Sequence, residues 1–164
     1  MAREIERKFL VKQIPAVKQR GSRSKIVQGY LPIASRKLQI RLRRKDSKYL
    51  LTVKRGRGLN RQEEEIEIPK ERFRALWPLT RGARISKSRY QISCGPRIIE
   101  LDVYNGRHRG LVTADVEFES ERQSKTFVPP AWLAREITGS RSYANQTLAR
   151  GQGVARKLRK ATAH

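Results

Sequence analysis

The sequence predicts an α+β domain: an eight-stranded antiparallel β-barrel with helices packed against its outside. Three observations lead to this fold class. Short segments with apolar residues at alternate positions follow one another over most of the chain. The positions between the apolar residues carry charged side chains, often in pairs of one sign. Helical patterns are few, and they follow the strand-like segments or interrupt them.

The strand prediction rests on a period of two, because alternate side chains of a strand face opposite sides of the sheet. Glycine, proline or charged turn residues separate the segments. We expect strands at residues 4–11, 26–33, 37–43, 49–55, 62–68, 85–92, 97–104 and 112–118.

Three segments have helical character. Residues 69–79 begin with Pro69, which suits the first turn of a helix. Residues 130–137 also begin with a proline. A third helix is expected to begin near Ser142 and to be interrupted by the glycines that follow residue 150.

The chain length of 164 residues predicts one domain, residues 1–149, followed by a basic C-terminal tail at residues 150–164. The chain has one cysteine, no apolar run of membrane-spanning length and no signal-like start, so we expect a cytoplasmic protein without disulfides and without a membrane partner. His108 lies in a turn-like segment and is expected to be solvated.

The formal net charge of +23 predicts an anionic partner. Nucleic acid and small polyphosphates both satisfy this electrostatic requirement, and composition does not separate them.

The charged residues of the strands are sorted by sign, with cation pairs and carboxylate pairs on different strands. An ordinary solvated sheet face explains any single strand, but such a face would mix the two signs. If the charged face turns inward, it lines a wet channel in which a polyanion satisfies the cations and divalent metals satisfy the carboxylates. The cations are Lys8, Arg41, Arg43, Lys54, Lys87 and Arg89, and the carboxylates are Glu4, Glu6, Glu63, Glu65, Glu67, Glu100, Asp102, Asp115 and Glu117.

The segment EIERKF contains the pattern ExExK, formed by Glu4, Glu6 and Lys8. With VQGYL, IRLR, LTVKRG, RQEEE, ISKSRY, ELDVYNG, GLVTADVEF and SYANQTLA in this order, the chain resembles the CYTH, or triphosphate tunnel metalloenzyme, superfamily over about residues 2–149. One departure is Asp115, where the family usually has a longer glutamate.

The resemblance implies an eight-stranded tunnel that binds a triphosphate together with Mg²⁺ or Mn²⁺. It implies that phosphate is bound by Lys8, Arg41, Arg43, Lys54, Arg61 and Arg89, and metal by Glu4, Glu6, Asp102, Asp115 and Glu117. Glu63, Glu65 and Glu100 are expected to have a secondary role. Lys87 is our candidate to protonate or stabilise the departing oxygen, and Tyr30 is a candidate to assist it, although a structural role for this tyrosine is equally compatible with the sequence.

The resulting hypothesis is a metal-dependent hydrolase of inorganic triphosphate or polyphosphate. Within the superfamily, hydrolysis of thiamine triphosphate and cyclisation of ATP remain alternatives. An alternative from another class is a non-catalytic module that binds polyphosphate, or nucleic acid through the surplus basic surface. The sequence leaves the oligomeric state open, a homodimer included.

Overall fold

The structure, a computed structural model, describes residues 5–16, 22–35, 37–56, 62–155 and 157–158. These residues form one sheet in which all neighbouring strands are antiparallel. The strand order is β5-β4-β3-β2-β6-β7-β8-β1-β9. The strands are β1 (Ile5–Val11), β2 (Arg23–Tyr30), β3 (Leu38–Lys45), β4 (Lys48–Arg55), β5 (Gln62–Glu67), β6 (Arg84–Cys94), β7 (Arg97–Tyr104), β8 (Val112–Phe118) and β9 (Leu133–Glu136).

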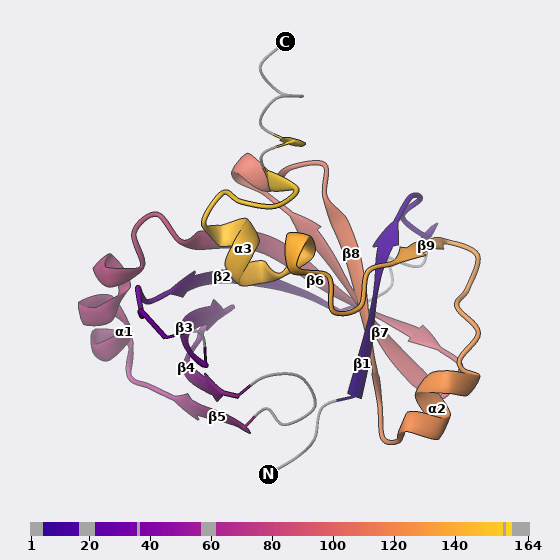
Figure 1. Ribbon diagram of the computed structural model, residues 1–164, viewed down its shortest axis with the longest axis horizontal. Coiled ribbons are helices and arrows are strands. Elements are labelled where there is room, and N and C mark those ends of the chain that lie inside the picture. The colour runs from indigo at the N-terminus through magenta and orange to yellow at the C-terminus, as the bar shows by residue number, and fades with distance from the viewer. Residues whose placement is uncertain (1–4, 17–21, 36, 57–61, 156, 159–164) are drawn as a thin grey trace.

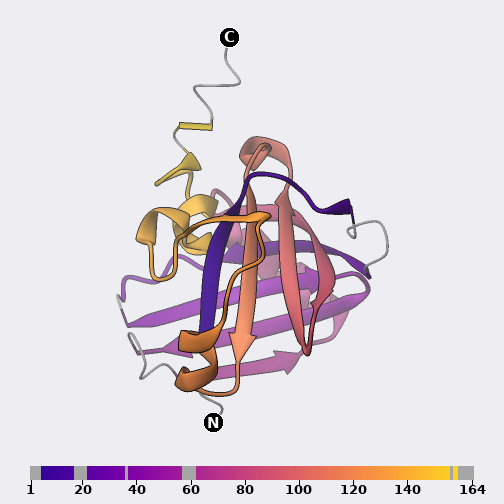
Figure 2. The ribbon, with the colours of Figure 1, turned by 90° about the vertical axis from the view of Figure 1, so that its right-hand side faces the viewer.

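The sheet is strongly curved. Figure 1 shows it bending from β5 at the lower left, through β2 and β6, to β8 and β1 at the right, so that one face is concave. In Figure 2, β1, β7 and β8 run across the direction of β2, β3 and β4. Short helices lie around the sheet: α1 (Lys70–Leu76), α2 (Glu121–Thr126) and α3 (Asn145–Ala149), with 3₁₀ turns η2 (Trp77–Thr80), η3 (Gly106–His108) and η4 (Arg141–Tyr143).

The antiparallel, α+β character is as predicted, but the closed eight-stranded barrel is not what the structure contains. Among the described residues the sheet has nine strands and is open, with β5 and β9 at its two edges. The predicted helix at residues 130–137 is wrong, because this segment contains β9. Strand β1 offers a free edge on the side away from β8, and β9 pairs with it. Arg7 fixes this pairing by donating two hydrogen bonds to the Glu136 carboxylate, at 2.9 and 2.8 Å.

The other helical predictions differ in extent. Helix α1 begins after Pro69 as expected, and η2 continues it to Thr80. The third helix, α3, begins three residues later than predicted and ends before Gly151, which has a positive φ. Helix α2 was not predicted, although Ser120 followed by Gln123 is a helix-start signal: the Ser120 hydroxyl accepts a hydrogen bond from the Gln123 N–H.

Two hydrophobic cores hold the curved sheet. The first lies on the outer face of β1, β7 and β8, where Phe9, Leu101 and Val116 pack together and Leu133 of β9 and Phe127 cover them. The second lies at one end of the concave face, where Leu148 and Ala149 of α3 pack against three side chains of the sheet: Tyr30, Ile85 and Tyr104. Figure 1 shows α3 in front of β2 and β6. Helix α3 therefore closes one end of the concave face.

Near its C-terminal end, β2 requires a residue without a side chain, Gly29. A Cβ added to Gly29 would lie 2.5 Å from Thr80 Oγ1 and 2.6 Å from Thr80 Cβ. Thr80 cannot yield easily, because it is buried, donates to Trp77 O at 2.7 Å and accepts from Arg84 Nε at 2.9 Å.

We therefore expect Gly29→Ala to lower the free energy of unfolding by about 1–3 kcal/mol, measured by urea unfolding. In a double-mutant cycle with Thr80→Gly, the cost of Gly29→Ala should largely disappear. Equal costs with and without Thr80 would show that this contact is not the constraint.

Candidate active site

The strand registers place the predicted charged residues on one face of the sheet. Directly paired residues point to the same side, and the pairs Ile26–Lys87, Arg89–Asp102, Glu100–Asp115 and Lys8–Asp115 link this face from β2 to β1. Glu4 and Arg61 lie outside the described residues. Every other predicted site residue lies on this face: Glu6, Lys8, Tyr30, Arg41, Arg43, Lys54, Glu63, Glu65, Lys87, Arg89, Glu100, Asp102, Asp115 and Glu117.

The curvature brings charges from distant strands together. The charge of Lys8 on β1 acts on Tyr30 of β2, although three strands separate them in the sheet. The charges of Lys8 and Arg43 also act on Lys87 of β6. The charged face is therefore the concave face, and we refer to it below by that name.

The deepest group on the concave face is an ion triad. Lys87 Nζ lies 2.5 Å from Asp102 Oδ2, and both side chains are completely buried. Arg89 approaches the same carboxylate with two donors, Nε at 2.7 Å from Oδ1 and Nη2 at 2.9 Å from Oδ2. Both oxygens of Asp102 thus accept hydrogen bonds from cations, which compensates the cost of burying a carboxylate.

Burial and neighbouring charges shift the pKa values of this triad. Desolvation, opposed by the Asp102 carboxylate and reinforced by Arg89, lowers the pKa of Lys87 to about 7. Desolvation would raise the pKa of Asp102, but Lys87 and Arg89 outweigh it and hold that pKa below its usual range. Asp102 is therefore ionised at neutral pH.

Arginines crowd the middle of the concave face. Arg41 is 7% exposed, and its Nη2 lies 3.1 Å from Thr52 Oγ1 and 3.2 Å from Glu65 Oε2. Arg43 donates from Nε to Gln28 Oε1 at 3.3 Å. Burial, together with the charges of Arg41 and Arg89, lowers the pKa of Arg43 to about 10. Like charges are thus concentrated where a bound anion would relieve their repulsion.

The buried Nε of Arg41 has no hydrogen-bond partner among the described residues. An unsatisfied buried donor is uncommon in native proteins and marks a place where a ligand can complete the bonding. This guanidinium therefore has capacity left for an acceptor from a bound molecule.

The other contacts between cations and carboxylates on the concave face are also ion pairs. Lys8 Nζ lies 3.5 Å from Asp115 Oδ1, and Arg89 Nη2 lies 3.7 Å from Asp115 Oδ2. Arg89 Nη1 also lies 2.5 Å from Glu100, and Lys54 Nζ lies 2.7 Å from Glu63. Each site cation except Arg43 thus has a carboxylate within 4 Å in the described structure.

Three carboxylates of β1 and β8 lie near one another on the concave face. Glu6 and Glu117 stand directly opposite each other on β1 and β8 and are both exposed. Like charges in this arrangement destabilise a sheet unless a cation lies between them. Asp115, two positions before Glu117, has a buried Oδ1 that lies 3.5 Å from Lys8 Nζ and has no hydrogen-bond partner among the described residues. Within the described ranges no three His, Cys, Asp or Glu residues group tightly enough to hold a metal by themselves.

Neutral side chains that the sequence prediction missed complete the concave face. Gln28 donates to Tyr30 Oη at 2.8 Å, and Thr52 donates to Glu65 Oε2 at 2.6 Å. Tyr104, opposite Lys87 in the register, donates to Asn145 Oδ1 of α3 at 2.6 Å. The sequence spacing could have identified them, because each lies an even number of positions from the charged residues of its own strand and therefore faces the same side of the sheet.

His108 is also placed differently from the prediction. It is buried rather than solvated, and its Nε2 lies 2.7 Å from Leu148 O of α3. A turn-like sequence gave no sign of the helix that later packs over it. His108 therefore belongs to the contacts that hold α3 at the end of the concave face.

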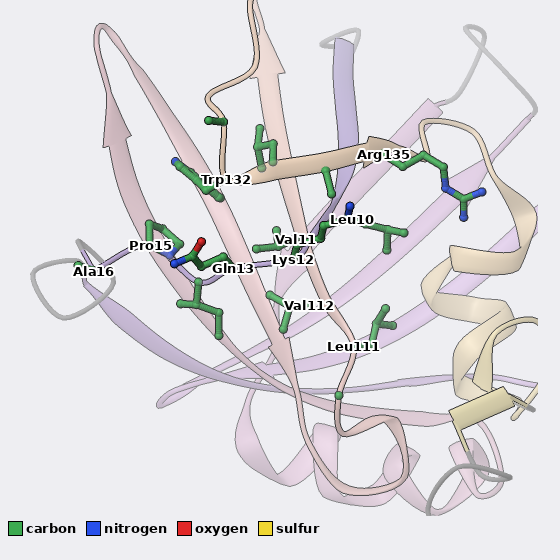
Figure 3. Close-up of a pocket in the computed structure, with 15 residues that line it drawn as sticks. Leu10, Val11, Lys12, Gln13, Pro15, Ala16, Leu111, Val112, Trp132 and Arg135 are labelled. Carbon is green, nitrogen blue, oxygen red and sulfur yellow. The ribbon is translucent and has the colours of Figure 1, made fainter.

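A separate cavity of about 990 Å³ lies near the end of β1 and beside β9 (Figure 3). Apolar side chains, among them Leu10, Leu111, Val112 and Trp132, form most of its wall. None of the predicted site residues lines it. Phosphate chemistry is therefore not expected there.

Fold and site together define an antiparallel β protein whose concave face carries paired arginines, lysines and carboxylates. The CYTH domain model matches residues 2–151, and the chain belongs to the CYTH domain family. The described residues include no helix with the length and apolarity required to cross a membrane.

Similar proteins cover nearly the whole chain. An inorganic triphosphatase of Nitrosomonas europaea is 40% identical over 148 residues, which cover 89% of this chain and 96% of that protein. An inorganic triphosphatase of Acetivibrio thermocellus is 35% identical over 150 residues, covering 90% and 94% of the two chains.

Solved structures agree with this family. A crystal structure of an inorganic triphosphatase superposes with a TM-score of 0.70 at 37% identity, over 92% of this chain and 96% of that chain. A protein of Pyrococcus horikoshii reaches a TM-score of 0.54 at 17% identity, over 98% and 99%, and shares the fold.

Proposed function

We propose that the protein hydrolyses inorganic triphosphate bound along the concave face. The observation that carries this proposal is the crowding of Arg41, Arg43 and Arg89, since burial and then the two neighbouring guanidinium groups lower the pKa of Arg43. A linear polyanion satisfies several such cations at once, whereas a single chloride or carboxylate satisfies few. The similarity to two inorganic triphosphatases over nearly the full chain supports the same substrate.

The finer arrangement is also a proposal. The phosphates lie on the concave face, in contact with Lys8, Arg41, Arg43, Lys54 and Arg89. Arg61 is proposed to reach the substrate as well. Glu63, Glu65 and Glu100 hold these cations in place through the ion pairs described above.

A divalent metal, Mg²⁺ or Mn²⁺, fits the carboxylates at the β1 side. Oxygen donors are the ligands that both ions prefer. We propose Glu6 and Glu117 as its principal holders, with Asp115 and Glu4 next in rank. Asp102 is a weaker candidate than the sequence suggested, because Lys87 and Arg89 occupy its oxygens. When bound, such a metal neutralises phosphoryl oxygens and favours attack by water.

The chain's own residues supply positioning and charge. Water attacks a terminal phosphorus, the bond between that phosphorus and its bridging oxygen breaks, and the products are phosphate and pyrophosphate. Lys87 stabilises or protonates the departing oxygen, a role compatible with a pKa of about 7 in the free protein. Tyr30 is buried and hydrogen-bonded to Gln28, so its assistance is limited to orienting neighbouring groups.

The decisive experiment measures phosphate release from inorganic triphosphate, ATP and thiamine triphosphate in parallel, each with Mg²⁺ and with Mn²⁺. We expect the highest kcat/KM for inorganic triphosphate and loss of turnover on addition of EDTA, restored by excess metal. Preference for ATP or thiamine triphosphate would reassign the substrate. Binding of triphosphate without turnover would favour the non-catalytic alternative.

Glu6→Gln tests the metal proposal. This variant removes one carboxylate charge from the β1 side, and we expect the metal concentration required for half-maximal rate to rise at least tenfold. Glu71→Gln on α1 removes the same charge from an exposed position outside the site and serves as the control. An equal metal dependence in both variants would exclude Glu6 as a ligand.

A further inference from the structure

The outer face of the central strands carries a set of basic residues that the proposed reaction does not use. Arg23 and Lys25 on β2, Arg44 on β3 and Arg84 on β6 share this face by register. Arg84 lies against η2, where its guanidinium donates to Thr80 Oγ1 at 2.9 Å and to Trp77 O at 2.8 Å, so it is not open to a partner. We call the three exposed residues, Arg23, Lys25 and Arg44, the outer basic band.

The band lies on the uncovered part of the sheet. At one side, the outer face of β4 is apolar and lies under α1, where Tyr49 meets Phe73 at 4.9 Å between ring centroids. At the other side, the outer face of β7, β8 and β1 is the first hydrophobic core. Between these two covered regions, Arg23, Lys25 and Arg44 are exposed. The sheet is thus apolar where it is covered and basic where it is open.

The reaction does not account for the charge of the protein. Of the 38 basic and 15 acidic residues, seven basic and eight acidic residues belong to the predicted site, which leaves 31 basic and seven acidic residues elsewhere. The site alone carries a slight negative formal charge. A substrate with three phosphates therefore does not explain a net charge of +23.

The band itself is almost free of acidic side chains. Among the described residues of the outer face of β2, β3 and β6 none is acidic, and Asp46, in the β3–β4 turn, lies at its margin. An ordinary solvated face would mix the signs. From the level of Arg23 to that of Val27, opposite Arg44, the band extends about 13 Å along β2.

We propose that the outer basic band binds the phosphate backbone of duplex DNA. Duplex DNA carries one negative charge per about 1.7 Å of its axis, so a band of this length faces many phosphates at once. The aromatic side chains nearby are already covered by guanidinium groups, with Arg84 4.4 Å from the Trp77 ring and Arg23 6.0 Å from the Tyr90 ring. They offer no open platform for unpaired bases, which favours a duplex over a single strand. Contacts to phosphate alone predict binding without sequence preference.

The test compares two double variants of equal net charge in the full-length protein. Lys25→Gln/Arg44→Gln removes two charges from the band, and Arg122→Gln/Lys125→Gln removes two exposed charges from α2. Binding to a 30-base-pair DNA of arbitrary sequence is measured by fluorescence anisotropy from 50 to 200 mM salt. We expect the band variant to lose at least tenfold in affinity and about 1.8 from the magnitude of the slope of log K against log salt. The α2 variant should match the wild type.

A third variant separates charge from shape. Lys25→Arg/Arg44→Lys keeps both charges and should bind DNA as the wild type does, and thermal melting should be unchanged in all three variants. Triphosphate hydrolysis should also be unchanged, because neither position lies on the concave face. Equal loss in the band and α2 variants, or tighter binding to duplex RNA or anionic phospholipid vesicles than to DNA, would overturn the proposal.

Discussion

Asp102→Asn is expected to lower the free energy of unfolding by about 3–5 kcal/mol, because it leaves two buried cations without their shared carboxylate. Lys87 and Asp102 are completely buried, and Arg89 is nearly so. No other described carboxylate lies within 4 Å of Lys87. Urea unfolding at pH 7 measures the loss, and Glu100→Gln, which removes a half-buried partner of Arg89, should cost much less.

The difference in unfolding free energy between the wild type and Asp102→Asn is expected to depend on pH. The pKa of Asp102 is lowered in the folded protein, whereas in the unfolded chain it is about 3.9. The stabilisation by the carboxylate is therefore fully present above pH 5 and is lost as the pH falls through the folded value. We expect the wild type and Asp102→Asn to converge in stability as the pH is lowered below about 4. A difference that stays constant down to pH 2 would show that Asp102 acts through packing and not through charge.

Lys87→Ala is expected to reduce kcat for inorganic triphosphate by about 10²–10⁴, the range typical of a group that stabilises the departing oxygen. Lys87 is the candidate because it is completely buried on the concave face and because burial lowers its pKa to about 7. Phosphate release under single-turnover conditions measures the effect.

Lys87→Met controls for the cavity that alanine leaves. Methionine keeps most of the volume and the apolar stem of lysine but carries no charge. We expect the same loss of kcat in both variants, with a smaller loss of stability for methionine. Turnover of Lys87→Met within threefold of the wild type would remove Lys87 from the chemistry.

The alternation of side chains made much of the fold predictable. Arg41 and Arg43 on one strand, and Asp115 and Glu117 on another, have the spacing that puts each pair on one side of a sheet, and the registers place both pairs on the same face. Such alternation is local and needs no knowledge of the partner strand. The roles assigned to these residues remain predictions.

Features set by distant contacts were not predictable. Strand β9 forms because β1 offers a free edge and Arg7 binds Glu136, 129 positions away in the sequence. His108 is buried because Leu148 of α3 returns to cover it. The same limit applies to barrel closure, which depends on whether the two edges of the sheet meet. Local pattern contains no information on any of these three contacts.

Titration calorimetry of inorganic triphosphate without divalent metal tests the central claim most directly, since it reports binding to the concave face separately from turnover. The wild type is predicted to bind one triphosphate per chain, and Arg43→Gln, which removes the most crowded guanidinium, to bind at least tenfold more weakly with an unchanged melting temperature. Equal affinity in the wild type and Arg43→Gln would contradict the assignment of this face as the phosphate site.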